Sequence, residues 1–436
     1  MSHPIAYALI AGLIGVLSSG LAMAEDTPGF QPDGARLHDY LEQAQSGNPE
    51  IQAFEHRYHA AIQRVPQAAA LPDPVLQVTA FVESVQTRTG PQDTAFSLSQ
   101  KIPWFGKLDS RESAASAEAE ALWYAYQAQQ LSLARRVSDS FFDYACLQEI
   151  LRLTEEGSKL LQKLEPVVEA KVQGGSDVNA LLRLKVEMGK VDDQLQSLEQ
   201  QRLAKSAELS QLLGLQNSDV LPWPDWNPPV AVSMDVSANL VALDSQNPEL
   251  EMLRRRVSSA EARKQIADLD RYPDVSIGLN YIQIGESATA VSDTGKDAWG
   301  VMLSVNLPLW VDKTRAARAE ALATQRAYED DLENRRNELG AELRGHLAFL
   351  EDASRRQKLY GKELVPLAEQ AVENSRASYE SGRTSIVELI DSERSLLDLR
   401  LTYWEAAAEV WKRRIAIQAL SNQPLMGTFK ATSEHE

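Results

Sequence analysis

The chain has 436 residues, of which 44% are hydrophobic and 24% are charged, and its formal net charge is −18. Such an acidic chain argues against nucleic acid as a partner, because binding a phosphate backbone requires a basic surface. The one cysteine, Cys146, rules out a disulfide within the chain and a cysteine-based metal cluster. We expect Cys146 to be a small buried apolar residue.

The N-terminus has the form of an export signal. An apolar run over 5–21 leads to Ala22-Met23-Ala24, a small-x-small cleavage motif, directly before Glu25. The run is short for a membrane helix, and polar sequence follows it at once. We therefore expect residues 1–24 to be a cleaved signal peptide, although no Lys or Arg precedes the apolar run; an uncleaved anchor is the alternative. No Cys follows the motif, so no lipid anchor on a mature N-terminal Cys is expected. Any membrane crossing by the mature chain is expected to use strands.

Four matching segments in the same order indicate an internal duplication. Asn48-Pro49-Glu50-Ile51 returns 199 positions later as Asn247-Pro248-Glu249-Leu250, and Pro72-Asp73 returns as Pro273-Asp274. The other two matches pair 98–104 with 303–309 and 174–178 with 382–386. The resulting division of the mature chain is a first repeat over 25–214, a Pro- and Trp-rich linker or equatorial collar over 215–246, a second repeat over 247–421 and a polar tail over 422–436.

Each repeat is expected to fold as a helix, two strands, a long helix, a turn and a helix. The first repeat predicts a helix over 35–67, strands over about 75–84 and 94–102, and a long helix after Pro103, because good helix formers dominate there and no proline occurs until Pro166. The second repeat predicts strands around 275–281 and 299–307, then a helix over 313–380. Helices of this length reach roughly 90–100 Å. Such lengths imply a tube, a stalk or a bundle.

The four predicted strands alternate apolar and polar residues. A half-buried strand of a soluble protein has the same period, but a length of about 8–10 residues also fits a tilted strand that spans a bilayer. Aromatic residues gather near one end of the strands, as in membrane-interface girdles; they are Trp104, Phe105, Tyr272 and Trp310. Four strands cannot close a barrel in lipid, because an open edge leaves backbone groups unpaired. Spanning strands would therefore require several copies of the chain, with outer-surface loops at 85–93 and 285–297.

Taken together, these features resemble the TolC family of outer-membrane efflux proteins over about 35–421. The most specific segment is 379–391, which looks like the family's tunnel tip: Tyr-x-x-Gly turns the chain, and two acidic residues three apart follow. The resemblance implies a mainly α fold with a small β part, in which long helical hairpins form an α-barrel. Four strands per subunit would contribute to a 12-stranded transmembrane β-barrel in a homotrimer. Segment 99–107 also looks like members associated with heavy-metal efflux.

The resemblance assigns roles to residues at the two hairpin turns. Glu388 and Asp391 would face the periplasmic aperture, while the tip turns would contact an adaptor through Gly174, Gly175, Asp177, Tyr379, Gly382 and Arg383. Residues i and i+3 share a helix face, and a ring of carboxylates around a narrow opening favours cations; the spacing alone also fits an ordinary solvated helix face. One departure is Ala180, which stands where a well-known member has an acidic residue. The Tyr-to-acid latch of that member is therefore expected to be absent.

The implied function is passive conduction from the periplasm to the exterior, in the outer membrane of a Gram-negative bacterium. The implied partners are a periplasmic adaptor and an inner-membrane pump, with contact to outer-membrane lipid. The alternatives are a type I secretion channel and a periplasmic adaptor or coiled-coil scaffold, although an adaptor usually has one helical hairpin and this chain predicts two. Metal ions, drugs and polypeptides all remain open as cargo.

The sequence contains no motif of enzymatic chemistry. It has no glycine-rich phosphate loop, no nucleophile elbow and no paired-cysteine motif, so we expect no enzymatic activity and no cofactor. His56 and His59 lie beside Glu55 on a predicted helix, but spacing places no third ligand, and no metal site is expected. Four tryptophans are expected to be packing residues: Trp223, Trp226, Trp404 and Trp411.

Overall fold

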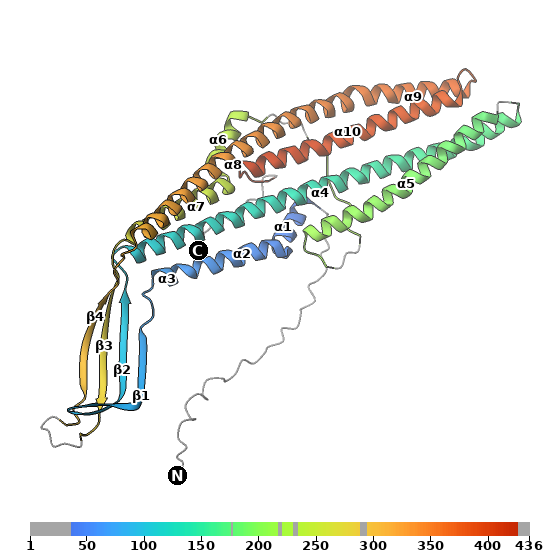
Figure 1. Ribbon diagram of the computed structural model, residues 1–436. Coiled ribbons are helices and arrows are strands. Elements are labelled where there is room, and N and C mark those ends of the chain that lie inside the picture. The colour runs from blue at the N-terminus through green and yellow to red at the C-terminus, as the bar shows by residue number, and fades with distance from the viewer. Residues whose placement is uncertain (1–35, 176–177, 217–219, 230–233, 288–293, 426–436) are drawn as a thin grey trace, which may run out of the picture.

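The computed structural model describes residues 36–175, 178–216, 220–229, 234–287 and 294–425. The molecule is elongated, with a four-stranded sheet at one end and the turns of two long helical hairpins at the other (Figure 1). The predicted signal peptide lies outside the described residues, as does most of the predicted tail. The mainly α fold with two repeats and four strands is confirmed.

The first repeat begins with three short helices: α1 (Leu37–Gly47), α2 (Pro49–Ile62) and α3 (Arg64–Ala69). The prediction of one helix over 35–67 was therefore wrong. Asn48 adopts an extended conformation, as residues before proline prefer, and its side chain caps α2 by accepting a hydrogen bond from the Glu50 N–H at 2.8 Å. Pro49 fits the first position of α2 but could not continue α1.

The sheet is antiparallel throughout, with the order β1 (Val75–Thr87), β2 (Gly90–Ile102), β3 (Val275–Ile284) and β4 (Ala298–Val305). The predicted loop over 85–93 was wrong, because β1 and β2 continue to a tight turn in which Thr87 pairs with Gly90. Gly90 has φ +141°, and a Cβ there would lie 1.7 Å from the Gly285 carbonyl oxygen, so this turn requires glycine. Of the second predicted loop, residues 288–293 lie outside the described residues.

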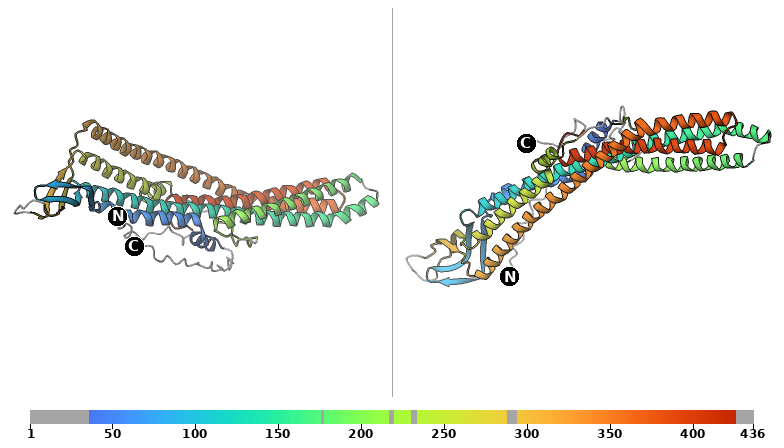
Figure 2. Two further views of the ribbon diagram at one scale, coloured as in Figure 1. Left: turned by 60° about the horizontal axis from the view of Figure 1, so that its bottom comes forward. Right: turned by 90° about the horizontal axis from the view of Figure 1, so that it is seen from above.

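Long helices form the rest of the molecule. The first repeat supplies α4 (Lys107–Gln173) and α5 (Val178–Leu212). The short α6 (Val236–Gln246) precedes the second repeat, which supplies α7 (Pro248–Leu269), α8 (Val311–Leu359), α9 (Val365–Glu380) and α10 (Ile386–Leu420). The 67 residues of α4 span about 100 Å. A π-helical turn, η1 (Tyr360–Leu364), joins α8 to α9, so the second long helix is continuous except for this turn. Two views in Figure 2 show the hairpins α4–α5 and α9–α10 running side by side.

The Pro- and Trp-rich segment packs against the middle of the helical bundle. Leu221 is buried, and its carbonyl oxygen accepts a hydrogen bond from the Tyr144 hydroxyl at 2.7 Å. Trp223 stacks on Tyr144 at 4.7 Å between ring centroids, and the Asn227 carbonyl oxygen accepts from the indole of a tryptophan on α10. The four tryptophans singled out in the sequence are therefore found in packing contacts. Trp226 and Trp404, which are far apart in the sequence, lie 5.4 Å apart between ring centroids. The predicted repeat boundaries themselves stay a prediction.

Candidate functional sites: the sheet face and the hairpin tips

One face of the sheet carries exposed apolar side chains in rows that cross all four strands. The register places Leu76, Leu98, Leu279 and Val301 in one row and Val78, Phe96, Tyr281 and Trp299 in the next. Every one of these eight side chains is exposed, Val301 by 72% and Trp299 by 75%. The opposite face is more polar, with Gln77, Ser97 and Asn280 in the intervening row. A continuous apolar face of this kind is unfavourable in water and suits contact with lipid.

Gln100 interrupts the apolar face. It lies in a row with Ile277 and Leu303, where a hydrocarbon-facing amide would be costly. Its side-chain Nε2 donates instead to the Pro72 carbonyl oxygen at 2.7 Å, and the residue is half-buried. The amide is therefore satisfied within the protein.

The predicted interface aromatics gather where the sheet meets the helices. Trp104 stacks on Tyr272 at 5.2 Å between ring centroids and meets Phe105 edge-on at 5.9 Å. Phe105 is 85% exposed, and Trp310, the residue before α8, is 77% exposed. A second aromatic group, Phe96, Tyr281 and Trp299, lies in one row, which is at the middle of β2 and near the far ends of β3 and β4. All three lie on the apolar face, and this second group was not predicted from the sequence.

A buried ion pair fixes the junction between sheet and helices. Lys107, at the start of α4, lies 2.9 Å from a carboxylate oxygen of Asp274, and Lys101 lies 3.1 Å from the other. The Trp104 N–H also donates to Asp274 at 3.0 Å. Burial favours the protonated carboxyl, but the hydrogen bonds from Lys107 and Trp104 outweigh it and hold the pKa of Asp274 at about 2. The cluster ties the start of β3 to the end of β2.

Both hairpin turns at the far end depend on glycine in the left-handed region. After α4, Gly175 has φ +98°, and after α9, Gly382 has φ +74°. The Arg383 N–H donates back to the Ser378 carbonyl oxygen at 2.8 Å, and the Gly382 N–H donates to the Tyr379 carbonyl oxygen at 3.1 Å. These bonds end α9 as helices with a left-handed glycine commonly end. Gly174, Gly175, Gly382 and Arg383 are exposed, whereas Asp177 lies outside the described residues.

The two acidic residues proposed for the aperture lie in the first two turns of α10. Glu388 is exposed and accepts a hydrogen bond from the Thr384 hydroxyl, while Ser385 caps the helix by accepting from the Glu388 N–H. The side chain of Asp391 is 63% exposed and lies 3.8 Å from Arg394. The buried neighbours Leu389 and Ile390 face the other helices. Both carboxylates are therefore accessible at the tip, on the solvent side of α10.

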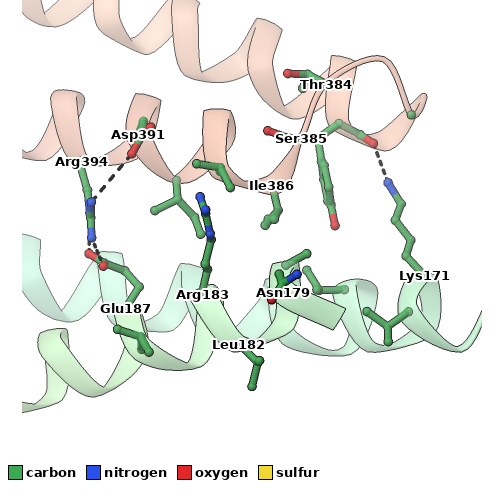
Figure 3. Close-up of a pocket in the computed structure, with 18 of the residues that line it drawn as sticks. Lys171, Asn179, Leu182, Arg183, Glu187, Thr384, Ser385, Ile386, Asp391 and Arg394 are labelled. Atoms are coloured by element: carbon green, nitrogen blue, oxygen red, sulfur yellow. Dashed lines mark hydrogen bonds and ion pairs between the residues drawn. The ribbon is translucent and has the colours of Figure 1, made fainter. Parts of the chain in front are cut away.

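Two contacts join the hairpins at the tips, and neither was predicted from the sequence (Figure 3). Arg394 on α10 forms a two-pronged ion pair with Glu187 on α5, with one N–O distance of 2.6 Å. Lys171 on α4 donates to the Tyr379 carbonyl oxygen at 2.6 Å, and its ammonium lies 3.7 Å from the Tyr379 ring centroid. Tyr379 is only 6% exposed, and burial raises the pKa of its hydroxyl. We call these two contacts the tip clasps.

Ala180 lies where the resemblance would place an acidic latch residue. It packs, partly buried, against an apolar cluster that includes Leu184 and Tyr379. Tyr379 thus has a cation and apolar groups around it in place of a carboxylate. A groove of about 1320 Å³ runs between the hairpins beside this cluster, and Lys171, Arg183, Asp391 and Arg394 are among its lining residues.

No described helix combines the length and apolarity required to cross a bilayer. Within the same residues, no group of three or more His, Cys, Asp or Glu side chains is placed to hold a metal ion. His59 lies 3.8 Å from Glu55 on α2; His59 is exposed and Glu55 is partly exposed.

A small sheet with an apolar outer face, continued by two long helical hairpins, defines the class of outer-membrane channel subunits. The family model described as outer membrane efflux protein matches residues 40–215 and 240–423. The chain belongs to this family, and is accordingly an outer-membrane protein of efflux. A similar curated protein is the pyoverdine export outer membrane protein OpmQ of Pseudomonas putida, 23% identical over 340 residues that cover 73% of this chain and 69% of OpmQ. The cation efflux system protein CusC of Escherichia coli is 21% identical over 318 residues, covering 71% and 68% of the two chains.

Solved structures share the fold. A crystal structure of CusC superposes with a TM-score of 0.76 at 17% identity, covering 91% of this chain and 96% of the other. The open state of the MtrE outer membrane channel of Neisseria gonorrhoeae gives a TM-score of 0.75 at 16% identity, covering 92% and 91%. At these sequence identities, the structural similarity shows only that the fold is shared.

Proposed function

We propose that this protein is the outer-membrane channel subunit of a tripartite efflux system and that it conducts cargo passively as a homotrimer. The observation that carries the proposal is the exposed apolar face of the sheet, whose rows run to both outer strands. In lipid the free edges of β1 and β4 require partners, because unpaired backbone groups are costly there. Three copies would supply twelve strands, within the range of bacterial barrels. The hairpins would then form a tunnel on the periplasmic side.

Cell fractionation, the detergent requirement and planar-bilayer recordings test this assignment. We expect the mature protein to fractionate with the outer membrane, to require detergent, and to form discrete pores in planar bilayers. An adaptor or scaffold would fractionate with the inner membrane or periplasm and form no pores. Deleting the gene and measuring tolerance to a panel of metals, dyes and antibiotics would identify the cargo class, while a secretion channel would instead lose an exported polypeptide.

The proposed aperture gate consists of Glu388 and Asp391. In a trimer the two exposed carboxylates would form a ring of six charges, which favours cations and repels anions. The double variant Glu388→Gln/Asp391→Asn should therefore lose cation preference in single-channel recordings. Glu380→Gln is the matched control, because Glu380 is also an exposed acidic residue at the tip but ends α9. Unchanged selectivity in the double variant would remove both residues from the aperture.

The proposed partners are a periplasmic adaptor, which docks at the hairpin tips, and an inner-membrane pump. The support is the exposure of Gly174, Gly175, Gly382 and Arg383 at the end of the molecule farthest from the sheet. Tyr379 is too buried to offer its ring to a partner, and we propose that it supports the turn from within. Replacing Arg383 with Glu should reduce efflux in cells while leaving pore conductance in bilayers unchanged. Normal efflux by that variant would argue against contact through Arg383.

A further inference from the structure

A second groove lies between the two hairpins, farther from their turns than the first. Its volume is about 480 Å³, and all four hairpin helices line it: α4 through Gly157, α5 through Val191, α9 through Val372 and α10 through Leu396. Hollows of about 300–1,000 Å³ between the helices of a bundle are common places for small molecules to bind. The second groove therefore has the size and the setting of a small-molecule site.

Most of the wall of this groove is aliphatic. Side chains from each helix contribute, among them Leu153, Leu161, Val191, Val372, Leu396 and Leu397. Gly157 interrupts this wall inside the long helix α4, where glycine is less favourable than any residue but proline. A Cβ at Gly157 would meet nothing within 4 Å, so no close contact in the chain requires glycine there. The missing side chain leaves open space in the groove.

One charge in the groove has no partner. All the other charged side chains that line it lie within 3.2 Å of an opposite charge: Arg376 pairs with Glu393, Arg394 with Glu187, Arg400 with Glu369 and Glu156 with Arg152. Asp398 is exposed, and its carboxylate makes no hydrogen bond or ion pair with the described part of the chain. The groove thus combines an apolar wall with one uncompensated negative charge.

The geometry points to a binding site for a lipophilic organic cation in this groove, with the apolar body of the ligand on the leucines and its charge beside Asp398. Covering the aliphatic wall removes apolar surface from water, which favours binding. Because Asp398 is exposed, the cation keeps part of its hydration, and the cost of desolvating the two charges is small. An anion of the same shape would be repelled by Asp398 and would find the arginines already paired.

This site is independent of the proposed oligomer. Every residue that lines the groove belongs to one chain, so a second copy contributes nothing that the argument uses. A channel that failed to form pores could still bind the cation, and a working channel could lack the site. The site and the proposed function can therefore fail separately.

Tetraphenylphosphonium and tetraphenylborate test the site, because they are nearly equal in size and apolar surface but opposite in charge. Their binding to the purified protein in amphipol would be measured by equilibrium dialysis. Gly157→Phe fills the groove, and Asp398→Asn removes its unpaired charge. The matched controls are Gly189→Phe and Asp193→Asn, at exposed positions of α5 outside the groove; a Cβ at Gly189 also meets nothing within 4 Å.

The wild type should bind tetraphenylphosphonium saturably and should not bind tetraphenylborate in that way. Saturable binding should disappear in Gly157→Phe and weaken about three- to fivefold in Asp398→Asn, as expected for loss of an exposed ion pair. Both control variants should bind as the wild type does. Since Gly157→Phe could fold poorly, its pore formation would be compared with that of the wild type, and Asp398→Asn decides alone if that variant forms no pores.

Three results would overturn the site. Undiminished binding of tetraphenylphosphonium by a well-folded Gly157→Phe protein would place the ligand elsewhere. Equal affinity of the wild type and Asp398→Asn, or equally tight binding of tetraphenylborate, would show that the carboxylate does not select the ligand's charge. Absence of pores in bilayers, with the binding pattern intact, would instead contradict only the proposed channel function.

Discussion

Asn48 and Asn247 make the same hydrogen bonds at equivalent places in the two repeats. Each precedes a proline that begins a helix, and each side-chain oxygen accepts from the backbone N–H of the following glutamate, at 2.8 Å and 2.9 Å. The Nδ2 of Asn48 donates to the Leu212 carbonyl oxygen at 2.8 Å, and the Nδ2 of Asn247 donates to the Leu420 carbonyl oxygen at 2.9 Å. Both asparagines are 3% exposed. Each therefore ties the start of one helix to the end of its repeat's last helix.

Replacing either asparagine with aspartate separates these two roles. Asn48→Asp and Asn247→Asp keep the capping acceptor but lose the donor and place a carboxylate against a carbonyl oxygen. We expect each change to lower the free energy of unfolding by about 1–3 kcal/mol, measured by denaturant titration of the detergent-solubilised protein. Asp235→Asn is the control, because this exposed residue only caps α6 and keeps its acceptor. Equal effects at Asp235 and Asn48 would show that the buried donor contributes nothing.

Much of this architecture could be predicted from the sequence, because its main signals are local and repeated. Asn-Pro pairs, strand alternation and long helix-forming runs each appear twice. The full extent of β1 and β2 was missed because the alternation ends at two polar residues: Ser84, the last residue of the first predicted strand, and Asp93, just before the second. In the fold these two side chains hydrogen-bond to each other across the hairpin at 2.5 Å.

The tip clasps could not be predicted for a different reason. Glu187 and Arg394 are separated by 207 positions, and nothing in the spacing of either residue indicates the other. Only the packing of the two hairpins brings them together. The acidic pair Glu388 and Asp391 was visible as a local motif. Nothing in the sequence indicated that Arg394, which lies beside Asp391, contacts the other hairpin.

The pH dependence of stability should contain a contribution from His346. This side chain is 8% exposed, and its Nδ1 lies 3.2 Å from an Arg413 nitrogen. Burial, together with the charges of Arg135 and Arg413, lowers the pKa of His346 to about 4. Because the folded pKa lies below the unfolded value, stability is fully present above about pH 6.5 and is lost as the pH falls toward 4; the loss is up to about 3 kcal/mol.

Comparing His346→Gln with the wild type isolates this contribution. The nearby Asp139 has a pKa raised to about 6 by burial, so it titrates in the same range with the opposite sign, in both proteins alike. Unfolding free energies measured from pH 4 to pH 7.5 should therefore rise with pH more steeply in the wild type than in the variant. Parallel curves would contradict the assignment.

Gly361 is required where the π-helical turn passes α10. A Cβ at this position would lie 2.6 Å from a ring carbon of Tyr403, so the ring or the backbone would have to move. We expect Gly361→Ala to destabilise the protein by about 1–3 kcal/mol. Gly345→Ala is the matched control, because Gly345 is also helical but a Cβ there meets nothing within 4 Å. That variant should gain about 0.5–1 kcal/mol. Thermal unfolding would measure both effects. Melting temperatures that shift in the same direction in the two variants would contradict the predicted clash between residue 361 and Tyr403.

The tip clasp between Arg394 and Glu187 should restrain the opening of the tunnel. It links α10 to α5, whereas the neighbouring Arg400 pairs at 2.6 Å with Glu369 on α9, inside one hairpin. Separating the hairpins must break the first pair and leaves the second intact. In planar bilayers we therefore expect Arg394→Ala to raise the resting conductance severalfold and Arg400→Ala to leave it unchanged.

The charge-swapped variant Glu187→Arg/Arg394→Glu distinguishes the ion pair from a general effect of altering the tip. Since the swap restores opposite charges across the same gap, its conductance should return toward the wild-type value, while Glu187→Arg alone should resemble Arg394→Ala. Raising the salt concentration should narrow the difference between the wild type and Arg394→Ala, because a pair with a 45% exposed arginine is screened. If Arg394→Ala and Arg400→Ala conduct alike, the clasp does not hold the tunnel closed, and the hairpins must be held by the apolar cluster around Leu389.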